Sequence, residues 1–214
     1  MTINCRGEVL ILDKDRAIYW EEKKMLIISD VHLGKSAHFR KHGIQVPSNV
    51  GTTDLQRLES LTNKYLPNLI LITGDMFHHK MNSDVLTFGN WRKSHPNTKI
   101  ILIKGNHDLL KMDDYVQLDI ELYEKELICG PFRFIHDQPT EFDEYYNITG
   151  HIHPGVTIYG KARQSLKFPC FYFGKTCAIL PAFSLFTGLS KINPENEDRF
   201  YAITPKEVLQ VHLS

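Results

Sequence analysis

The chain of 214 residues lacks the features that mark several protein classes. Its 4 cysteines are far apart and form no C-x-x-C pair, and each lies in or beside an apolar stretch. We therefore expect reduced thiols in a cytoplasmic protein. No apolar run approaches the roughly 20 residues that span a membrane. The first residues lack a basic region followed by an apolar core, so we expect no signal peptide and no membrane association.

An excess of charge of one sign is also absent, because 25 Lys and Arg residues balance 25 Asp and Glu residues. Any contact with nucleic acid must therefore come from a local patch. No linker-like tract, internal repeat or low-complexity segment divides the chain. Residues 1–214 are long enough to bury a sizeable core, and we expect them to form a single domain.

The first half of the chain predicts strands that alternate with helices. Short apolar runs at 25–28, 69–72 and 99–103 predict buried strands, and residues 8–12 and 17–20 predict a hairpin before them. Segments 53–66 and 83–94 predict helices, the second with Ser83 as its N-cap. This alternation predicts parallel strands with right-handed crossovers, whose carboxyl ends bind ligands.

From Asp119 onward, strands dominate and predict a mostly antiparallel or mixed sheet. The expected fold is therefore α/β, with two packed mixed β-sheets flanked by helices. The predicted strands of this half are residues 120–123, 126–128, 132–135, 146–149, 156–159, 171–173, 177–180, 199–203 and 208–212.

Five polar clusters coincide with the ends of predicted strands. They are Asp30-Val-His32, Gly74-Asp75, Gly105-Asn-His-Asp108, His136 and Gly150-His-Ile-His153. Imidazole and carboxylate groups bind Zn, Mn and Fe, and asparagine adds a neutral oxygen. The clusters offer more ligands than one ion could use, which indicates a two-metal hydrolase site.

Each cluster taken alone also has an ordinary explanation. Asp30 could cap a loop, Gly74-Asp75 is common turn chemistry, and a single His136 after a strand is more often structural. We expect strand alternation to place Asp30 and His32 on one face, and the imidazoles of 151–153 likewise. The occurrence of all five clusters at strand ends favours the metal site.

The motifs D-x-H, G-D, G-N-H-D, H and G-H-x-H, in this order over residues 30–153, resemble the calcineurin-like metallophosphoesterases. That resemblance implies the sandwich fold of the family and two groups of metal ligands joined by a shared carboxylate. The first group is Asp30, His32 and His153, the second is Asn106, His136 and His151, and the bridging residue is Asp75.

The same resemblance implies a role for the third cluster in catalysis. Two divalent ions would share a hydroxide that attacks phosphorus. His107 would stabilise charge or protonate the leaving oxygen, and we expect Asp108 to orient it. The expected activity is that of a metal-dependent phosphoesterase.

A narrower resemblance is to the bacterial DNA ligase-associated (PdeM-type) metallophosphoesterases. It implies a manganese-favouring phosphodiesterase with DNA endonuclease activity, linked to a helicase, a nuclease and a DNA ligase in repair; zinc and iron are alternatives. The segments that carry it are 30–35, Phe39-Arg40, Gly43, 74–78, Pro131-Phe132, 169–171 and 180–183.

Substrate contacts are less clearly indicated. Lys35, Arg40 and Lys41 could hold flanking phosphates, or could be a solvated helix face. His79 is a candidate substrate contact, whereas the neighbouring histidines at 38, 42 and 78 are expected to be lining or surface residues. A phosphomonoesterase or protein phosphatase of the same fold remains an alternative. A non-catalytic scaffold is the remote one, because such proteins lose the Asn-His pair that is intact here.

Overall fold

The computed structural model describes residues 1–35, 50–78, 82–139, 144–160 and 164–212. Arg40, Lys41 and His79, predicted as basic or substrate-contacting residues, lie outside these ranges, as do the histidines at 38 and 42. Within the described part of the chain, no helix is both long enough and apolar enough to cross a membrane.

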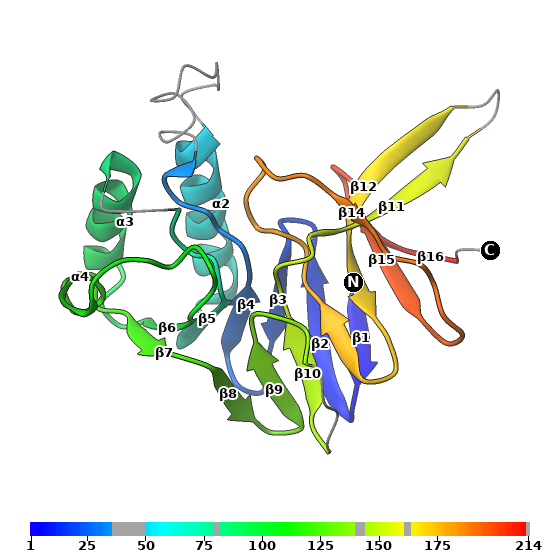
Figure 1. Ribbon diagram of the computed structural model, residues 1–214, viewed down its shortest axis with the longest axis horizontal. Helices are drawn as coiled ribbons and strands as arrows, with labels where there is room; N and C mark the ends of the chain where they lie inside the picture. The colour runs from blue at the N-terminus through cyan, green and yellow to red at the C-terminus, as the bar shows by residue number, and fades with distance from the viewer. Residues whose placement is uncertain (36–49, 79–81, 140–143, 161–163, 213–214) are drawn as a thin grey trace.

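The first sheet is mixed and has the order β1-β2-β3-β4-β5-β6-β7 (Figure 1). From β1 through β4, each strand is antiparallel to the next. From β4 through β7, each strand is parallel to the next. The predicted hairpin and the three predicted parallel strands are therefore confirmed. The strands are β1 (Thr2–Cys5), β2 (Glu8–Asp13), β3 (Ala17–Trp20), β4 (Met25–Ile28), β5 (Leu69–Thr73), β6 (Lys99–Ile103) and β7 (Glu121–Tyr123).

Two expectations about this half were wrong. We assigned the segment now seen as β7 to the second half, but it pairs in parallel with β6 of the first sheet. The N-cap of helix α3 (Ser83–Lys93) is Asn82 instead of Ser83, because the Asn82 side chain accepts the backbone N–H groups of Asp84 and Val85.

The second sheet is also mixed, as expected. Its main path runs β14-β11-β12-β13-β10-β9-β8, with β15 joining β12 to β16. Parallel pairs join β9, β10 and β13, whereas β12 is antiparallel to its neighbours. The strands are β8 (Glu126–Cys129), β9 (Phe132–Ile135), β10 (Tyr146–Thr149), β11 (Pro154–Tyr159), β12 (Ser165–Phe173), β13 (Cys177–Ile179), β14 (Ser190–Lys191), β15 (Arg199–Ile203) and β16 (Val208–Val211).

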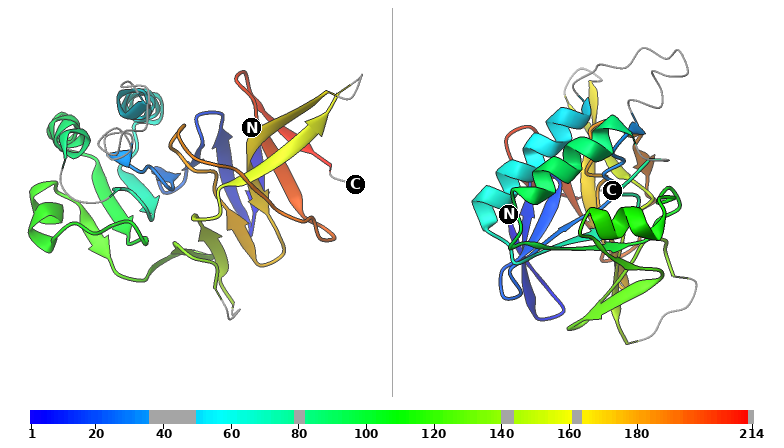
Figure 2. Two further views of the ribbon diagram at one scale, coloured as in Figure 1. Left: turned by 45° about the horizontal axis from the view of Figure 1, so that its top comes forward. Right: turned by 90° about the vertical axis from the view of Figure 1, so that its left-hand side faces the viewer.

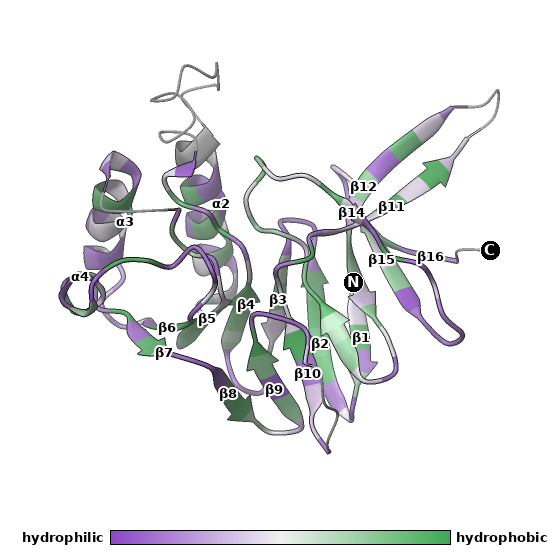
Figure 3. Ribbon diagram, viewed as in Figure 1, coloured by the Kyte–Doolittle hydropathy of each residue, from purple (hydrophilic) through white to green (hydrophobic). Residues whose placement is uncertain are grey.

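Alternation along the central strands divides the core into layers. On β5, Leu71 faces the second sheet and contributes to a cluster with Phe134 and Ile148. Its neighbours Ile70 and Ile72 face the helices on the other side of the sheet. Helices α2 (Val50–Tyr65) and α3 lie side by side on that face (Figure 2), and the central strands are strongly hydrophobic (Figure 3). A short helix, α4 (Met112–Gln117), follows β6.

This arrangement brings strand ends from both sheets to one rim. The loops after β4, β5 and β6 leave the first sheet at the carboxyl ends of its parallel strands. The loops after β9 and β10 leave the second sheet, and Gly150 N–H donates to the carbonyl oxygen of His136 between them. The polar clusters of the sequence are therefore assembled from two sheets.

One buried carboxylate lies away from that rim and makes a pH-dependent contribution to stability. Asp13 is 4% exposed and accepts hydrogen bonds from Lys64 Nζ at 2.6 Å, Tyr65 Oη at 2.7 Å and Asp15 N at 2.9 Å. Burial would raise the pKa of Asp13, but these partners together outweigh it and lower the pKa. Its ionised form therefore stabilises the folded state.

We expect Asp13→Asn to lower the free energy of unfolding by about 2 kcal/mol at neutral pH. The penalty should be complete above the unfolded-state pKa of about 3.9 and should disappear as pH falls through the lower folded-state pKa. Urea denaturation of both proteins across this range measures it, with Glu22→Gln on the exposed surface as the control. A penalty that stayed constant with pH would contradict the ionic role of Asp13.

Candidate metal centre

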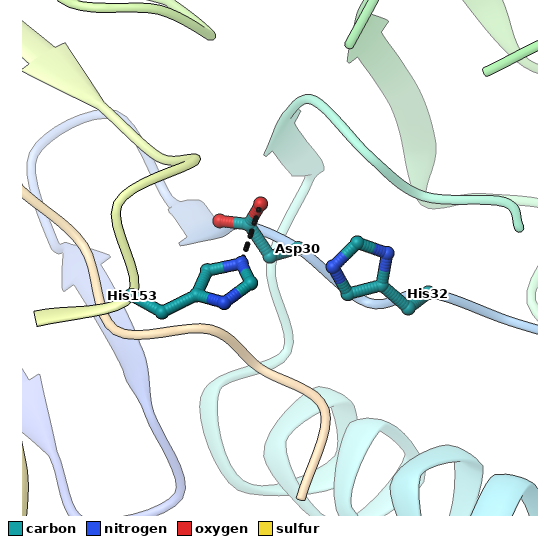
Figure 4. Close-up of side chains that lie close together, drawn as sticks. All are labelled: Asp30, His32 and His153. Atoms are coloured by element: carbon teal, nitrogen blue, oxygen red, sulfur yellow. Dashed lines mark ion pairs between the residues drawn. The ribbon is translucent and has the colours of Figure 1, made fainter. Parts of the chain in front are cut away.

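The first ligand group joins the loop after β4 to the loop before β11. Asp30 Oδ1 lies 3.2 Å from His153 Nε2, and His32 lies beside them with its ring centroid 5.5 Å from that of His153 (Figure 4). The ligand atoms of the three residues lie within 4.8 Å of one another. Asp30 and His32 are buried, whereas His153 is partly exposed.

The second ligand group lies at the ends of β5, β9 and β10. His136 Nε2 is 3.5 Å from Asp75 Oδ1 and 3.2 Å from His151 Nδ1. Asn106, after β6, reaches the group with its side-chain nitrogen 3.4 Å from His151 Nδ1. The other ring nitrogen of His136 is 3.0 Å from the Thr73 carbonyl oxygen, which leaves Nε2 directed into the group.

Backbone hydrogen bonds hold the two groups against each other. The N–H of His151 donates to Asp30 Oδ2 at 3.0 Å, and the N–H of His107 donates to Asp75 Oδ1 at 2.8 Å. Ser29 Oγ donates to Asp30 Oδ2 at 2.6 Å. Each carboxylate is therefore fixed on one side by donors from the loops around it.

The loops reach this geometry through an unusual backbone. Asp30, His32, Asp75, His151 and His153 all have positive φ angles, between 51° and 65°. We expected strand alternation to place Asp30 and His32 on one face, and likewise the two imidazoles of 151–153. That reasoning was wrong, because residues with positive φ are not in an extended strand. The imidazoles of 151–153 enter different groups. Positive φ is costly for residues other than glycine, and such strain collects at functional sites.

The donor set suits divalent metal ions. Both ring nitrogens of His32 are buried and make no hydrogen bond, and buried His153 Nε2 makes none either, although it lies 3.2 Å from Asp30 Oδ1. Burial, together with the nearby Lys35 charge, lowers the pKa of His32 to about 3, so its imidazole is neutral and able to bind a metal. Buried polar atoms normally have partners, and a metal ion would satisfy these nitrogens.

Electrostatics in the second group also favour a bound cation. Burial would raise the pKa of Asp75, but the His136 side chain and the His107 backbone N–H outweigh it and lower the pKa well below its usual range. Burial would lower the pKa of His136, yet the hydrogen bond with Asp75 raises it to about 9. The Asp75 carboxylate is thus ionised and attracts positive charge, which the proton on His136 supplies here; a metal ion bound by His136 Nε2 would displace that proton.

The candidate catalytic pair lies beside the two groups. His107 is exposed, and its ring centroid is 5.5 Å from that of His32. Asp108 is fully buried and accepts the backbone N–H of Phe77 at 2.9 Å and that of Gly105 at 2.8 Å. The Asp108 carboxylate therefore joins the loops after β5 and β6, a contact that the sequence did not indicate.

Two further residues at the site were not singled out as functional from the sequence. His78, expected to be a lining or surface residue, is 9% exposed, and its ring centroid is 4.9 Å from that of His107. Asp137 places a carboxylate oxygen 3.6 Å from His151 Nδ1. The signal for Asp137 was its position directly after His136, and that for His78 was its place three residues after Asp75, within segment 74–78.

Of the predicted substrate contacts, the structure describes Lys35. Its side chain is partly buried at the edge of the site. Burial lowers the pKa of Lys35, while Asp30 and Asp75 act to raise it. Lys35 thus lies close enough to both carboxylates for their negative charges to stabilise its ammonium group.

Comparison with known proteins agrees with this geometry. A family model described as calcineurin-like phosphoesterase matches residues 23–209. The nuclease MPE of Pseudomonas putida has 30% sequence identity and a TM-score of 0.83, with 99% of each chain covered. YfcE, a phosphoesterase from E. coli, has 15% identity and a TM-score of 0.47, covering 87% of this chain and 97% of its own. No curated protein matches the sequence. The chain belongs to the calcineurin-like phosphoesterase family and is a metal-dependent phosphoesterase.

Proposed function

We propose that the protein is a manganese-dependent phosphodiesterase that cleaves DNA internally. The observation that carries the proposal is the exposed side of the site, where Asn106, His107 and His151 meet solvent while the remaining ligand candidates lie beneath. A phosphodiester in the middle of a polymer can reach such a rim. The similarity to the Pseudomonas nuclease along almost the entire length of both chains supports the same substrate class.

The proposed ligands are the two groups of the candidate metal centre. Asp30, His32 and His153 would hold one ion, and Asp75, His136 and His151, with Asn106 beside them, would hold the other; the family resemblance implies that Asp75 also serves the first ion. When bound, two divalent ions neutralise charge on the phosphate and lower the pKa of water toward about 7. Mixed oxygen and nitrogen donors accept manganese, and also zinc and iron.

Two residues of the G-N-H-D cluster have distinct proposed roles. His107 is exposed beside the ligand groups, so its imidazole can donate a proton to the leaving oxygen. Asp108 is a positioning residue, because its carboxylate holds the backbone of Phe77 and Gly105. Its effect on His107 therefore passes through the loop that carries both residues.

The biological setting is part of the proposal. Action in DNA repair in the cytoplasm, alongside a helicase, a nuclease and a DNA ligase, rests on the resemblance of segments such as 30–35 and 74–78 to the PdeM-type proteins. The balanced net charge of the chain means that its grip on DNA must be local.

The decisive experiment compares a diester with a monoester substrate. We expect metal-stripped protein to be inactive, and added manganese to restore hydrolysis of bis(4-nitrophenyl) phosphate in preference to 4-nitrophenyl phosphate. A covalently closed circular DNA should then be nicked, which requires no free end. Preference for the monoester would instead indicate a phosphomonoesterase. Nicking supported better by zinc or iron would correct the metal assignment alone.

A further inference from the structure

A two-stranded arm leaves the second sheet directly after the proposed ligand His153. It consists of β11 and β12, and Figures 1 and 2 show it projecting away from the body of the protein. Its base is fixed beside the site, because Ser190 N–H donates to the His153 carbonyl oxygen and β14 pairs with the first residues of β11. The arm therefore has a defined position relative to the metal centre.

The two faces of this β11–β12 arm differ in character. One face packs on a small cluster formed by Val156, Cys170, Phe200 and Ala202. Because paired residues share a face, the register Thr157–Lys167 and Tyr159–Ser165 places these four residues on the opposite face. Lys191 pairs with Gly155 and so extends the same face onto β14. Both strands mix hydrophilic and hydrophobic residues (Figure 3).

That opposite face is exposed. Tyr159 is 80% exposed, and Ser165, Lys167 and Lys191 are also exposed. Lys167 Nζ donates to the carbonyl oxygen of Leu189, the residue before β14, which holds its charge at the start of that strand. Two lysines and an exposed aromatic ring on one face match the chemistry of a nucleic-acid strand, whose phosphates bind lysine and whose bases stack on aromatic rings.

The charge distribution along the chain supports the same partner. Residues 145–194 contain no Asp or Glu, whereas they contain Lys161, Arg163, Lys167, Lys175 and Lys191. The chain as a whole has a net charge of zero, so the rest of it is acidic by the same amount. The segment that includes the arm is thus a local basic region in a neutral protein, which favours an anionic partner.

We propose that the exposed face of the β11–β12 arm, centred on Tyr159, Lys167 and Lys191, binds the DNA strand next to the phosphodiester being cleaved. This inference rests on the proposed function and names where the substrate is held. Six strand residues from Pro154 to Tyr159 extend roughly 20 Å, so the arm runs from Lys191 beside the site to Tyr159, several nucleotides along the bound strand. It contributes affinity for a polymer and none for a small diester.

The test uses a double variant, Lys167→Ala with Lys191→Ala, and measures DNA binding separately from hydrolysis. A matched control, Lys23→Ala with Lys125→Ala, removes the same charge from exposed turns of other regions. For a fluorescent oligonucleotide, we expect the double variant to reduce the magnitude of the slope of log affinity against log salt by about 1.4–1.8. Each of the two lost phosphate contacts accounts for about 0.7–0.9 of this change. Tyr159→Ala should weaken single-strand binding by about fivefold or more. Hydrolysis of bis(4-nitrophenyl) phosphate should stay at the parent level in all three.

The outcomes separate this inference from the proposed function. If the parent nicks DNA but the arm variants bind and cleave it like the control, the arm inference is overturned and the proposed function stands. If the parent binds DNA through the arm lysines without cleaving it, the arm inference stands and the proposed activity fails. Binding to phosphatidylserine vesicles through these lysines, with no binding to DNA, would overturn the inference in favour of a membrane surface.

Discussion

Substitution of Asp75 by Asn is expected to reduce kcat for the diester by on the order of a thousandfold or more, because a single preorganised charge-stabilising group is already worth 10²–10³. Asp75 follows β5 at the centre of the site, where its carboxylate contacts His136 and accepts the His107 backbone N–H. Asn keeps the shape and one acceptor oxygen but removes the charge that pairs two cations. Manganese titration should show that the variant binds fewer ions than the parent.

His107→Asn provides the matched comparison. The His107 ring stands beside the ligand groups and is not counted among the proposed ligands. We expect its substitution to lower kcat by about 10²–10⁴, as for a lost general acid, while both ions remain bound. If His107→Asn lost its metal ions as Asp75→Asn does, the proton-donor role would be incorrect and His107 would have to be a ligand.

The second large effect is expected at Gly150, where the loop after β10 meets the end of β4. A Cβ there would lie 1.8 Å from Ser29 Oγ, 2.7 Å from Asp30 Oδ2 and 2.9 Å from the Thr73 carbonyl oxygen. Ser29 cannot rotate away freely, because its hydroxyl lies within hydrogen-bond distance of both neighbouring oxygens and rotation would lose the bond it donates. Gly150→Ala should therefore lower the free energy of unfolding by about 3 kcal/mol and weaken manganese binding by about 10–100-fold.

Gly188→Ala is the control for this substitution, since a Cβ at Gly188 meets nothing within 4 Å. Its effect on stability should stay within about 0.5 kcal/mol. Urea denaturation in the presence of a chelator gives the free energy of unfolding of both variants. A Gly150→Ala protein as stable as the parent, with unchanged manganese affinity, would show that the loop can relax and that the close approach is not needed.

The sequence predicted the central sheet because its signals there are strong. Apolar runs such as 69–72 are long enough to mark buried strands, and each ends abruptly at a polar cluster that the fold brings to the common rim. Helix α3 was also clear, but its N-cap was not, since Asn82 and Ser83 are adjacent and both types cap helices well. Local pattern thus located the elements more reliably than their ends.

Other features depend on contacts that a single sequence does not display. Helix α4 is short, and its segment Met112–Gln117 has little apolar periodicity. The sheet that β7 joins is decided by its pairing with β6, which composition near Asp119 does not encode. The positive φ of the candidate ligands was invisible for a similar reason, because these residue types ordinarily avoid it and tertiary contacts impose it.

The positive φ angles at the site lower the stability of the fold, yet the residues that adopt them are the ones that metal binding requires. Five of the proposed metal-binding residues hold conformations that glycine would adopt at no steric cost, while only a carboxylate or imidazole can serve as the ligand. Each of them costs stability on the order of 1 kcal/mol that the packed sheets must supply. Selection for higher folding stability alone would therefore favour replacement of these ligand residues first. A lineage that no longer needed the activity would gain stability by replacing them.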